Sequence, residues 1–330
     1  MSVTKAAEKK ASSNRRSAEL LDLYERMVLI REAERMCGVL FAEGEIPGFI
    51  HLSDGQEAVS VGVMASMTAE DTISSTHRGH GHALAKGLAL DSFFKELMGK
   101  VDGACKGRGG SMHVADLSVG MLGANGIVGG GVAIAVGSGL AHKLRGGDAI
   151  AASFFGDGAL AEGVFHESLN IASLMQIPVL FACENNGWSE FSPTSTQIVF
   201  SLEDLAAAHK IDYRRVDGSD LEEVSAVASE IIDAMRRDRR PRVLECITVR
   251  ARGHFEGDAQ RYRGAGPAPV DPLAKTRLLL EEAGASAGDL DQLSERARTQ
   301  VAAAIEAARR SDEPTLQSAA EEVYAQGVKP

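Results

Sequence analysis

Residues 149–188 read AIAASFFGDGALAEGVFHESLNIASLMQIPVLFACENNGW. Two apolar runs, 149–155 and 178–183, flank a segment, 160–175, whose apolar residues recur at helical spacing. Apolar runs without polar alternation are typical of strands that are buried on both faces, and the helix between them indicates a strand–helix–strand crossover. This stretch therefore predicts a parallel sheet that is covered by helices on both faces.

Helical and strand patterns also alternate on both sides of this stretch. It predicts helices over residues 17–44, 55–67, 132–144, 203–209 and 221–236, and strands over 71–76, 213–216 and 242–249. Residues 1–16 are basic but have no apolar run behind them, so we expect a disordered arm there. We expect one α/β domain over residues 17–330, with C-terminal helices from about residue 271 and no second domain.

Composition excludes several classes of protein. The formal net charge of -11 argues against a nucleic-acid partner, because phosphates would be repelled. No run of about 18 apolar residues exists, so we expect no membrane span. The four cysteines, Cys37, Cys105, Cys183 and Cys246, form no CxxC pair, which favours reduced thiols and a cytoplasmic location.

Glycine and polar residues follow the expected strands, at the edge where open parallel sheets bind ligands. Asp157 and Asn186 follow two strands that one crossover joins, so their oxygen atoms should meet at one point and suit Mg²⁺. Gly156 and Gly158 would let a diphosphate approach the backbone. A helix beginning near Ala159 would point its free N–H groups at that anion.

A GDG motif followed one crossover later by NN resembles the signature of thiamine diphosphate enzymes. From about residue 20 to 275 the chain resembles the E1 α subunits of 2-oxo acid dehydrogenase complexes. The matching motifs are GFIHL (48–52), GQEA (55–58), HR (77–78), GRGGSMH (107–113), NGIVG (125–129), GDG (156–158), ENN (184–186) and GH (253–254). The resemblance implies the thiamine diphosphate-binding fold, with thiamine diphosphate and Mg²⁺ as cofactors.

The resemblance also implies roles for individual residues. Asp157 and Asn186 would bind Mg²⁺ through their side chains, and Trp188 through its backbone carbonyl. Arg78 and His254 would contact the diphosphate end of the cofactor.

The remaining site residues are also implied by the resemblance. The backbone of Gly126 and Val128 would line the pyrimidine, and His51 would lie on the substrate side. His77 stands where the family usually has tyrosine. We take His254, together with His77 and His51, as the candidates for the proton steps.

The activity implied is cleavage of acetoin, or decarboxylation of pyruvate, with transfer of the acyl unit to a lipoyl-bearing E2 acyltransferase. Residues 186–191 and 254–263 look most like bacterial acetoin dehydrogenase α subunits, while branched-chain and other 2-oxo acids stay open. Phe255 replaces the serine that regulated members phosphorylate. The family places an essential glutamate on a second domain, so a separate β-type subunit and an α₂β₂ assembly are expected.

Other classes fit less well. A dinucleotide-binding dehydrogenase needs GxGxxG directly after a strand, and the glycines at 129–131 have no good strand before them. The P-loop motif GxxxxGK[ST] is absent. Asp157 could merely cap a helix, and residues 185–187 could be a simple turn. A noncatalytic scaffold subunit remains a third class, although the intact Asp157, Asn186 and His254 speak against it.

Overall fold

A six-stranded parallel sheet forms the centre of the molecule. The computed structural model describes residues 2–264 and 270–323, with side chains described for 16–264 and 270–321. The strand order is β2-β1-β3-β4-β8-β7, and every neighbouring pair is parallel. The strands are β1 (Thr72–Ser74), β2 (Met121–Gly123), β3 (Ala151–Gly156), β4 (Val179–Asn185), β7 (Asp212–Asp217) and β8 (Arg242–Ile247). This architecture confirms the predicted α/β fold class.

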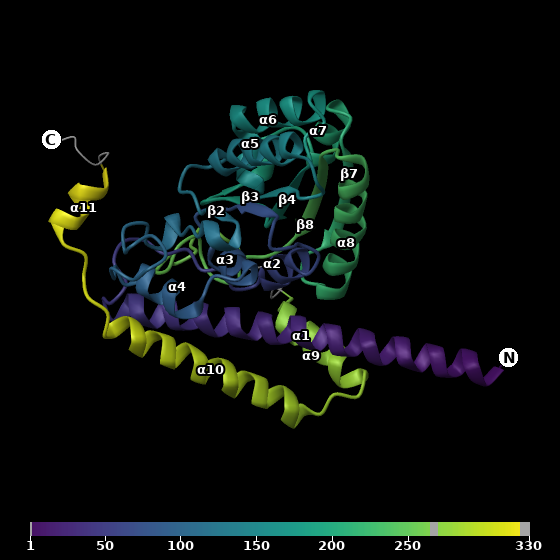
Figure 1. Cartoon of the computed structure of the whole chain (residues 1–330), viewed down its shortest axis with the longest axis horizontal. Helices are drawn as coiled ribbons and strands as arrows, with labels where there is room; N and C mark the ends of the chain where they lie inside the picture. The colour runs from purple at the N-terminus through teal and green to yellow at the C-terminus, as the bar shows by residue number, and fades with distance from the viewer. Residues whose placement is uncertain (1, 265–269, 324–330) are drawn as a thin grey trace.

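Helices cover both faces of the sheet (Figure 1). One face carries α5 (Gly130–Arg145), α6 (Gly163–Leu174) and α7 (Leu202–Ala208). The opposite face carries α2 (Glu57–Met64), α3 (His80–Lys86) and α8 (Leu221–Asp238). The two apolar cores meet only through the sheet, as expected for strands that are buried on both sides.

The side chains of β3 show why the sequence reads as an unbroken apolar run. Ala151 and Phe155 belong to the core beneath α5, α6 and α7, whereas Ala152 and Phe154 belong to the opposite core. Successive side chains of a strand point to opposite faces, so a strand between two helical layers needs apolar residues at every position. Residues of β4 alternate between the two cores in the same way.

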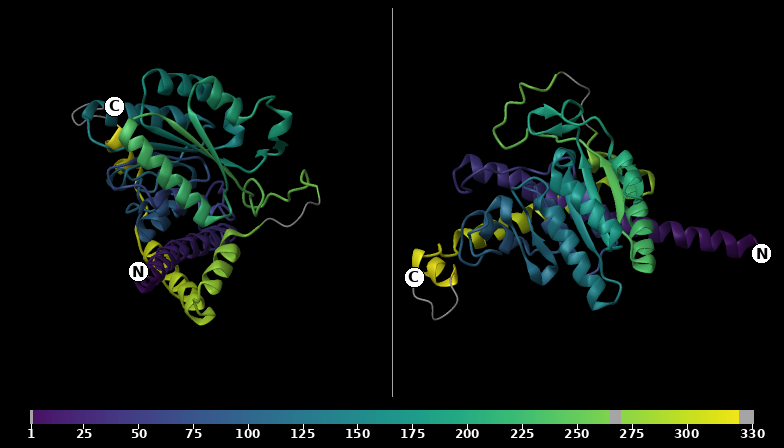
Figure 2. Two further views of the ribbon diagram at one scale, coloured as in Figure 1. Left: turned by 90° about the vertical axis from the view of Figure 1, so that its right-hand side faces the viewer. Right: turned by 90° about the horizontal axis from the view of Figure 1, so that it is seen from above.

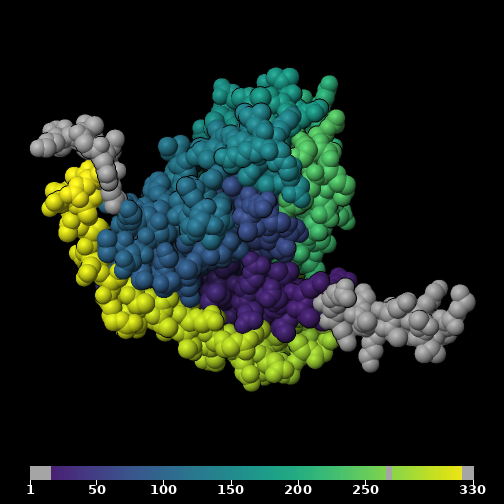
Figure 3. All heavy atoms as spheres, in the orientation of Figure 1, coloured from purple at the N-terminus to yellow at the C-terminus, as the bar shows by residue number. Residues whose placement is uncertain are grey.

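A second set of helices lies outside this layer. It comprises α1 (Ser2–Ala42), α4 (Leu90–Leu97), α9 (Pro272–Glu282), α10 (Ala287–Arg309) and α11 (Leu316–Val323). Helices α1 and α10 pack side by side along the underside of the domain (Figures 1 and 2). In the space-filling view, the described atoms of these helices form a continuous band there (Figure 3).

Several boundaries differ from those predicted. Helix α1 ends at Ala42, and Gly44 takes the left-handed backbone conformation (φ +80°) that commonly follows a helix. Helix α1 begins at Ser2, but side chains are described only from residue 16. The division into an arm and one domain stays a prediction. The predicted helix start near Ala159 is wrong, because residues 157–161 form a 3₁₀ turn and α6 begins at Gly163.

Five short helices and strands were not predicted. Three of them are α3, α4 and β2, and α3 buries His80 and His82 where an apolar stripe would be expected. A short antiparallel pair, β5 (Trp188–Ser189) and β6 (Ser192–Pro193), also follows β4. Among the described residues, no helix combines the length and apolarity needed to cross a bilayer.

Candidate active site

A cavity of about 320 Å³ opens at the carboxyl ends of the central strands. Eleven of the twelve residues that the sequence singles out line it: His51, His77, Arg78, Gly126, Val128, Gly156, Gly158, Ala159, Asn186, Trp188 and His254. The twelfth, Asp157, is buried (1% exposed) and is not itself among the lining residues. The cavity is large enough for a small organic cofactor.

Asp157 and Asn186 lie side by side because β3 and β4 are paired neighbours. Asn186 donates its backbone N–H to Asp157 Oδ1 at 3.1 Å, and the Thr194 hydroxyl donates to Oδ2. Asn186 Oδ1 accepts the backbone N–H of Trp188 at 3.2 Å. Burial raises the pKa of Asp157, although the hydrogen bonds from Thr194 and from the Asn186 backbone oppose that shift. The structure therefore brings together Asp157 and Asn186, which lie at the tips of the loops after β3 and β4 and on which the metal prediction depends.

The donor set at these tips suits Mg²⁺. Each carboxylate or amide oxygen keeps a second lone pair beyond the hydrogen bond that it accepts. Hard oxygen ligands of this kind, completed by a backbone carbonyl and phosphate oxygens, match the octahedral preference of Mg²⁺. A Cβ at Gly158 would lie 2.7 Å from Ser189 Oγ, whereas one at Gly156 would meet nothing within 4 Å. The backbone is therefore closely packed on one side of Asp157 and open on the other.

Two arginines, Arg78 and Arg250, line the cavity together with two carboxylates, Glu184 and Glu190. Arg78 donates to the carbonyl oxygens of Leu52 and, at 2.8 Å, of His254. Burial, followed by the charge of Arg250, lowers the pKa of Arg78 to about 10. Arg250 Nε is buried and has no hydrogen-bond partner within the described chain. The unpaired Nε of Arg250 leaves a charged donor available to an anionic ligand such as a diphosphate.

Sequence reasoning did not single out Arg250, although one signal was present. Arg250 lies three residues beyond the end of β8, at the same sheet edge as Asp157 and Asn186. Thr194 could not have been found in this way, because it reaches Asp157 only through the fold of the β5–β6 hairpin.

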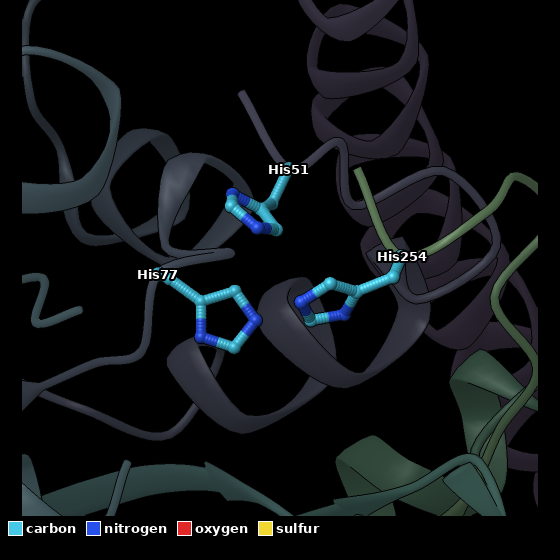
Figure 4. A group of neighbouring side chains, drawn as sticks. All are labelled: His51, His77 and His254. Atoms are coloured by element: carbon cyan, nitrogen blue, oxygen red, sulfur yellow. The ribbon is translucent and has the colours of Figure 1, made fainter. Parts of the chain in front are cut away.

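Three histidines face one another beside the arginines (Figure 4). Ring centroids are 4.6 Å apart for His51 and His77, 4.9 Å for His51 and His254, and 5.3 Å for His77 and His254. Burial, with Arg78 next in importance, lowers the pKa of His51 to about 3 and that of His254 to about 4. The same causes hold the pKa of His77 well below its usual range. All three rings are therefore neutral at physiological pH.

Helix α5 presents its N-terminus to the cavity. We had expected a helix beginning near Ala159 to do so, and that prediction was wrong. Its first turn contributes Gly131 and Val132 to the lining. Gly129, the residue before the helix, has φ +77°, a backbone conformation that favours glycine. The free N–H groups and dipole of this helix favour negative charge at its N-terminus.

Residues 101–131 are rich in glycine, and this stretch divides into two parts with different tasks. Residues 125–129 line the cavity, whereas residues 105–110 wrap around the fully buried carboxylate of Glu96. That carboxylate accepts the backbone N–H groups of Cys105, Gly107, Gly109 and Gly110, at 2.6–3.0 Å. The loop that precedes the cavity residue Met112 is thus fixed by one side chain.

Two further buried histidines lie next to the cavity without lining it. His80 contacts Glu34 Oε2 at 2.9 Å and Ser111 Oγ at 2.8 Å. His82 stacks on Phe154 and contacts Ser75 Oγ at 2.8 Å. Their contacts hold α3 and the loops around the cavity in place.

Comparison with known proteins shows the family. Residues 25–317 match the family described as dehydrogenase E1 component, and the chain belongs to it. The α subunit of acetoin:2,6-dichlorophenolindophenol oxidoreductase from Bacillus subtilis is 49% identical over 73% of each chain. The corresponding subunit from Cupriavidus necator is 42% identical over 92% of this chain and 94% of its own. The pyruvate dehydrogenase E1 α subunit of Zymomonas mobilis is 38% identical over 93% and 87%, respectively.

Proposed function

We propose that the chain is the α subunit of a thiamine diphosphate- and Mg²⁺-dependent E1 enzyme that cleaves acetoin. The observation that carries this proposal is the meeting of Asp157 and Asn186 beside a glycine-lined cavity that contains two arginines. Two of the similar relatives are named for acetoin, which favours that substrate over pyruvate. Pyruvate is the second candidate, because other relatives are pyruvate dehydrogenase subunits.

In this proposal the chain binds the diphosphate half of the cofactor. Asp157 and Asn186 bind Mg²⁺ through side-chain oxygens, and Trp188 binds it through its carbonyl. The diphosphate lies against residues 156–159, where Arg78 and Arg250 offset its charge. Residues 126–128 line the pyrimidine side of the cavity.

The cofactor supplies, when bound, the carbanion that attacks the substrate carbonyl. The chain orients that reaction, excludes water and supplies histidines for the proton steps. For acetoin, the bond between the carbonyl carbon and the carbinol carbon breaks and releases acetaldehyde. The remaining two-carbon unit is oxidised to acetyl as the disulfide of a lipoyl group is reduced. One sulfur carries the acetyl group and the other becomes a thiol.

We place a β-type subunit against the open side of the cavity, in an α₂β₂ assembly. Ile127 (73% exposed), Val128 (46%) and Ile134 (49%) lie at or just beyond the cavity lining, on the loop before α5 and on α5 itself. Ile171 and Leu174 of α6 are also exposed. Exposed apolar side chains on neighbouring elements beside a cavity favour a protein interface there. The partner would bring the glutamate that engages the pyrimidine.

The location and the acyl acceptor belong to the same proposal. The four cysteines are free thiols in the structure, which fits a reducing, cytoplasmic compartment. The acceptor is a lipoyl-bearing E2 acyltransferase, since the reaction must pass its acyl unit and two electrons to a disulfide.

The test is reconstitution with a β-type E1 chain, which we would seek first in the reading frames that neighbour this one. We expect acetoin-dependent reduction of 2,6-dichlorophenolindophenol that requires both chains, Mg²⁺ and thiamine diphosphate. Activity with pyruvate but not acetoin would reassign the substrate. Turnover by this chain alone would contradict the two-subunit site. Cofactor binding without turnover of any 2-oxo acid or acetoin would favour the scaffold class.

A further inference from the structure

A chain of hydrogen bonds outside the cavity leads to the loop after β4. Glu245 lies on β8, is 6% exposed and is not among the residues that line the cavity. Its Oε1 accepts the side-chain N–H of Asn185 at 2.7 Å, and its Oε2 accepts the hydroxyl of Tyr213 from β7. Strands β4, β8 and β7 are consecutive in the sheet (Figure 1). Because Asn185 directly precedes Asn186, Glu245 is joined to the loop that carries a proposed Mg²⁺ ligand.

A carboxylate at this position does not serve the apolar core. Its neighbours on β8, Val243, Leu244 and Cys246, are fully buried and apolar, and an apolar side chain at 245 would continue their pattern. Among the described residues, its ion-pair partner is the exposed Arg215, whose Nε lies 3.9 Å from Oε2. An exposed pair at that distance contributes little. The two hydrogen bonds to Asn185 and Tyr213 therefore account for the buried carboxylate better than packing or charge pairing does.

The bond to Glu245 fixes the orientation of the Asn185 amide. The backbone N–H of Gly187 meets the other end of this amide at 3.1 Å. That N–H can only donate, so the atom that it meets is Oδ1, and the NH₂ group faces Glu245. The backbone carbonyl of Asn185 accepts the N–H of Thr248, just beyond β8, at 2.8 Å. Asn186 is thus held between two residues whose positions the Asn185 side chain sets.

The same turn also reaches the second proposed metal ligand. The carbonyl oxygen of Gly187 accepts the backbone N–H of Thr194 at 3.1 Å, and the hydroxyl of Thr194 donates to Asp157 Oδ2. The other carboxylate oxygen of Asp157 accepts the backbone N–H of Asn186. A shift of the turn at 185–187 would therefore move the hydrogen-bond partners of both Asp157 and Asn186.

We propose that Glu245 is a positioning residue that acts through Asn185 to hold the loop at 185–188 ready for a small divalent cation. This inference rests on the proposed function, which places Mg²⁺ between Asp157 and Asn186. Mg²⁺ demands nearly ideal octahedral geometry, whereas the larger Ca²⁺ accepts flexible arrangements of six to eight oxygens. A loop that is held in place before the ion arrives therefore favours Mg²⁺ over Ca²⁺.

The first experiment compares Glu245→Met with Glu245→Gln in the enzyme reconstituted from both chains, at saturating thiamine diphosphate. Metal binding is followed by the fluorescence of Trp188, the single tryptophan, which lies in this loop. Methionine fills the space without accepting the hydrogen bond, so we expect Mg²⁺ to bind about 10- to 100-fold more weakly. Glutamine keeps an acceptor for Asn185, so we expect affinity within about threefold of the wild type. Glu230→Met is the matched control, because that exposed carboxylate of α8 only pairs with Arg214.

The second experiment repeats the titrations with Ca²⁺ and separates positioning from a general loss of structure. We expect Glu245→Met to change the Ca²⁺ affinity by less than about threefold, so that the preference for Mg²⁺ falls by about tenfold or more. A general loosening of the protein would weaken both ions by the same factor. Asn185→Ala removes the same hydrogen bond from its other side and gives a second, independent variant. Adding Glu245→Met to it should weaken Mg²⁺ binding no further, because both substitutions remove one interaction.

The inference is overturned if Glu245→Met binds Mg²⁺ as the wild type does, if glutamine loses as much affinity as methionine, or if Mg²⁺ and Ca²⁺ weaken equally. It is also overturned if the losses of Glu245→Met and Asn185→Ala multiply in the double variant. Wild-type enzyme that shows no Mg²⁺-dependent binding of thiamine diphosphate would instead overturn the proposed function.

Discussion

Replacing Glu96 by glutamine tests how the glycine-rich loop is held. Each carboxylate oxygen of Glu96 accepts two backbone N–H groups, Oε2 those of Cys105 and Gly107, and Oε1 those of Gly109 and Gly110. Glutamine keeps one oxygen and replaces the other by an NH₂ group. Two of the four N–H donors then lose their acceptor and face another donor.

The magnitude follows from those two donors. A buried donor that loses its partner costs about 1–3 kcal/mol, so the pair costs roughly 2–6 kcal/mol. The four hydrogen bonds are only partly buried, and water will compensate in part, so we expect about 2–3 kcal/mol. This is less than the roughly 5–15 kcal/mol that holds a typical domain together, so the loop should open while the sheet stays folded.

Hydrogen exchange of the four amides is the appropriate assay. A loss of about 2–3 kcal/mol corresponds to roughly 30- to 150-fold less protection at residues 105–110, with amides of β3 and β4 unchanged. Glu295→Gln is the control, because that exposed carboxylate only pairs with Arg298 on the same helix. Unchanged protection of the loop in the Glu96 variant would refute this account of how it is ordered.

Three further changes have definite expected outcomes. Asp157→Ala should weaken Mg²⁺-dependent cofactor binding by on the order of 100-fold or more, measured by fluorescence of the single tryptophan, with unchanged circular dichroism. Native affinity would refute the metal assignment. The pKa of His254 is lowered to about 4, so the unfolded chain binds its proton first as pH falls. The free energy of unfolding should therefore decrease as the pH is lowered from about 6.5 to 4. His254→Gln should make this decrease smaller by on the order of 1 kcal/mol, after allowance for solvent screening. An identical slope would contradict this. Gly62→Ala should destabilise by about 1–3 kcal/mol, because its Cβ would lie 2.7 Å from Val224, whereas Gly137→Ala, with nothing within 4 Å, should stabilise α5 in thermal unfolding. Equal effects would show that α2 and α8 are not tightly packed.

The sheet could be predicted because its information is local. Residues 149–188 carry two apolar strands and a helix, and the hand and length of the crossover then require the ends of β3 and β4 to be neighbours. For the same reason the proximity of Asp157 and Asn186 could be predicted from the sequence.

Other parts of the site depend on contacts that no local pattern encodes. Thr194 reaches the cavity only after the β5–β6 hairpin has folded against it. Arg250 could be placed at the sheet edge from its position after β8, but its hydrogen bonds to Glu190 and His254 form only once these loops have folded. The 3₁₀ turn after Asp157 resembles a helix start in sequence, and the helix N-terminus that faces the cavity is that of α5. Short elements such as α3 lack an apolar stripe, because buried hydrogen bonds of His80 and His82 hold that helix instead.

Anomalous scattering from Mn²⁺, soaked with thiamine diphosphate into crystals of the reconstituted enzyme, would report directly on the metal site. We expect one strong peak within roughly 2.5 Å of an Asp157 carboxylate oxygen and Asn186 Oδ1, with the Trp188 carbonyl as a third protein ligand and diphosphate oxygens completing the shell. A peak elsewhere, or a diphosphate bound without an ion between these two loop tips, would contradict the assignment.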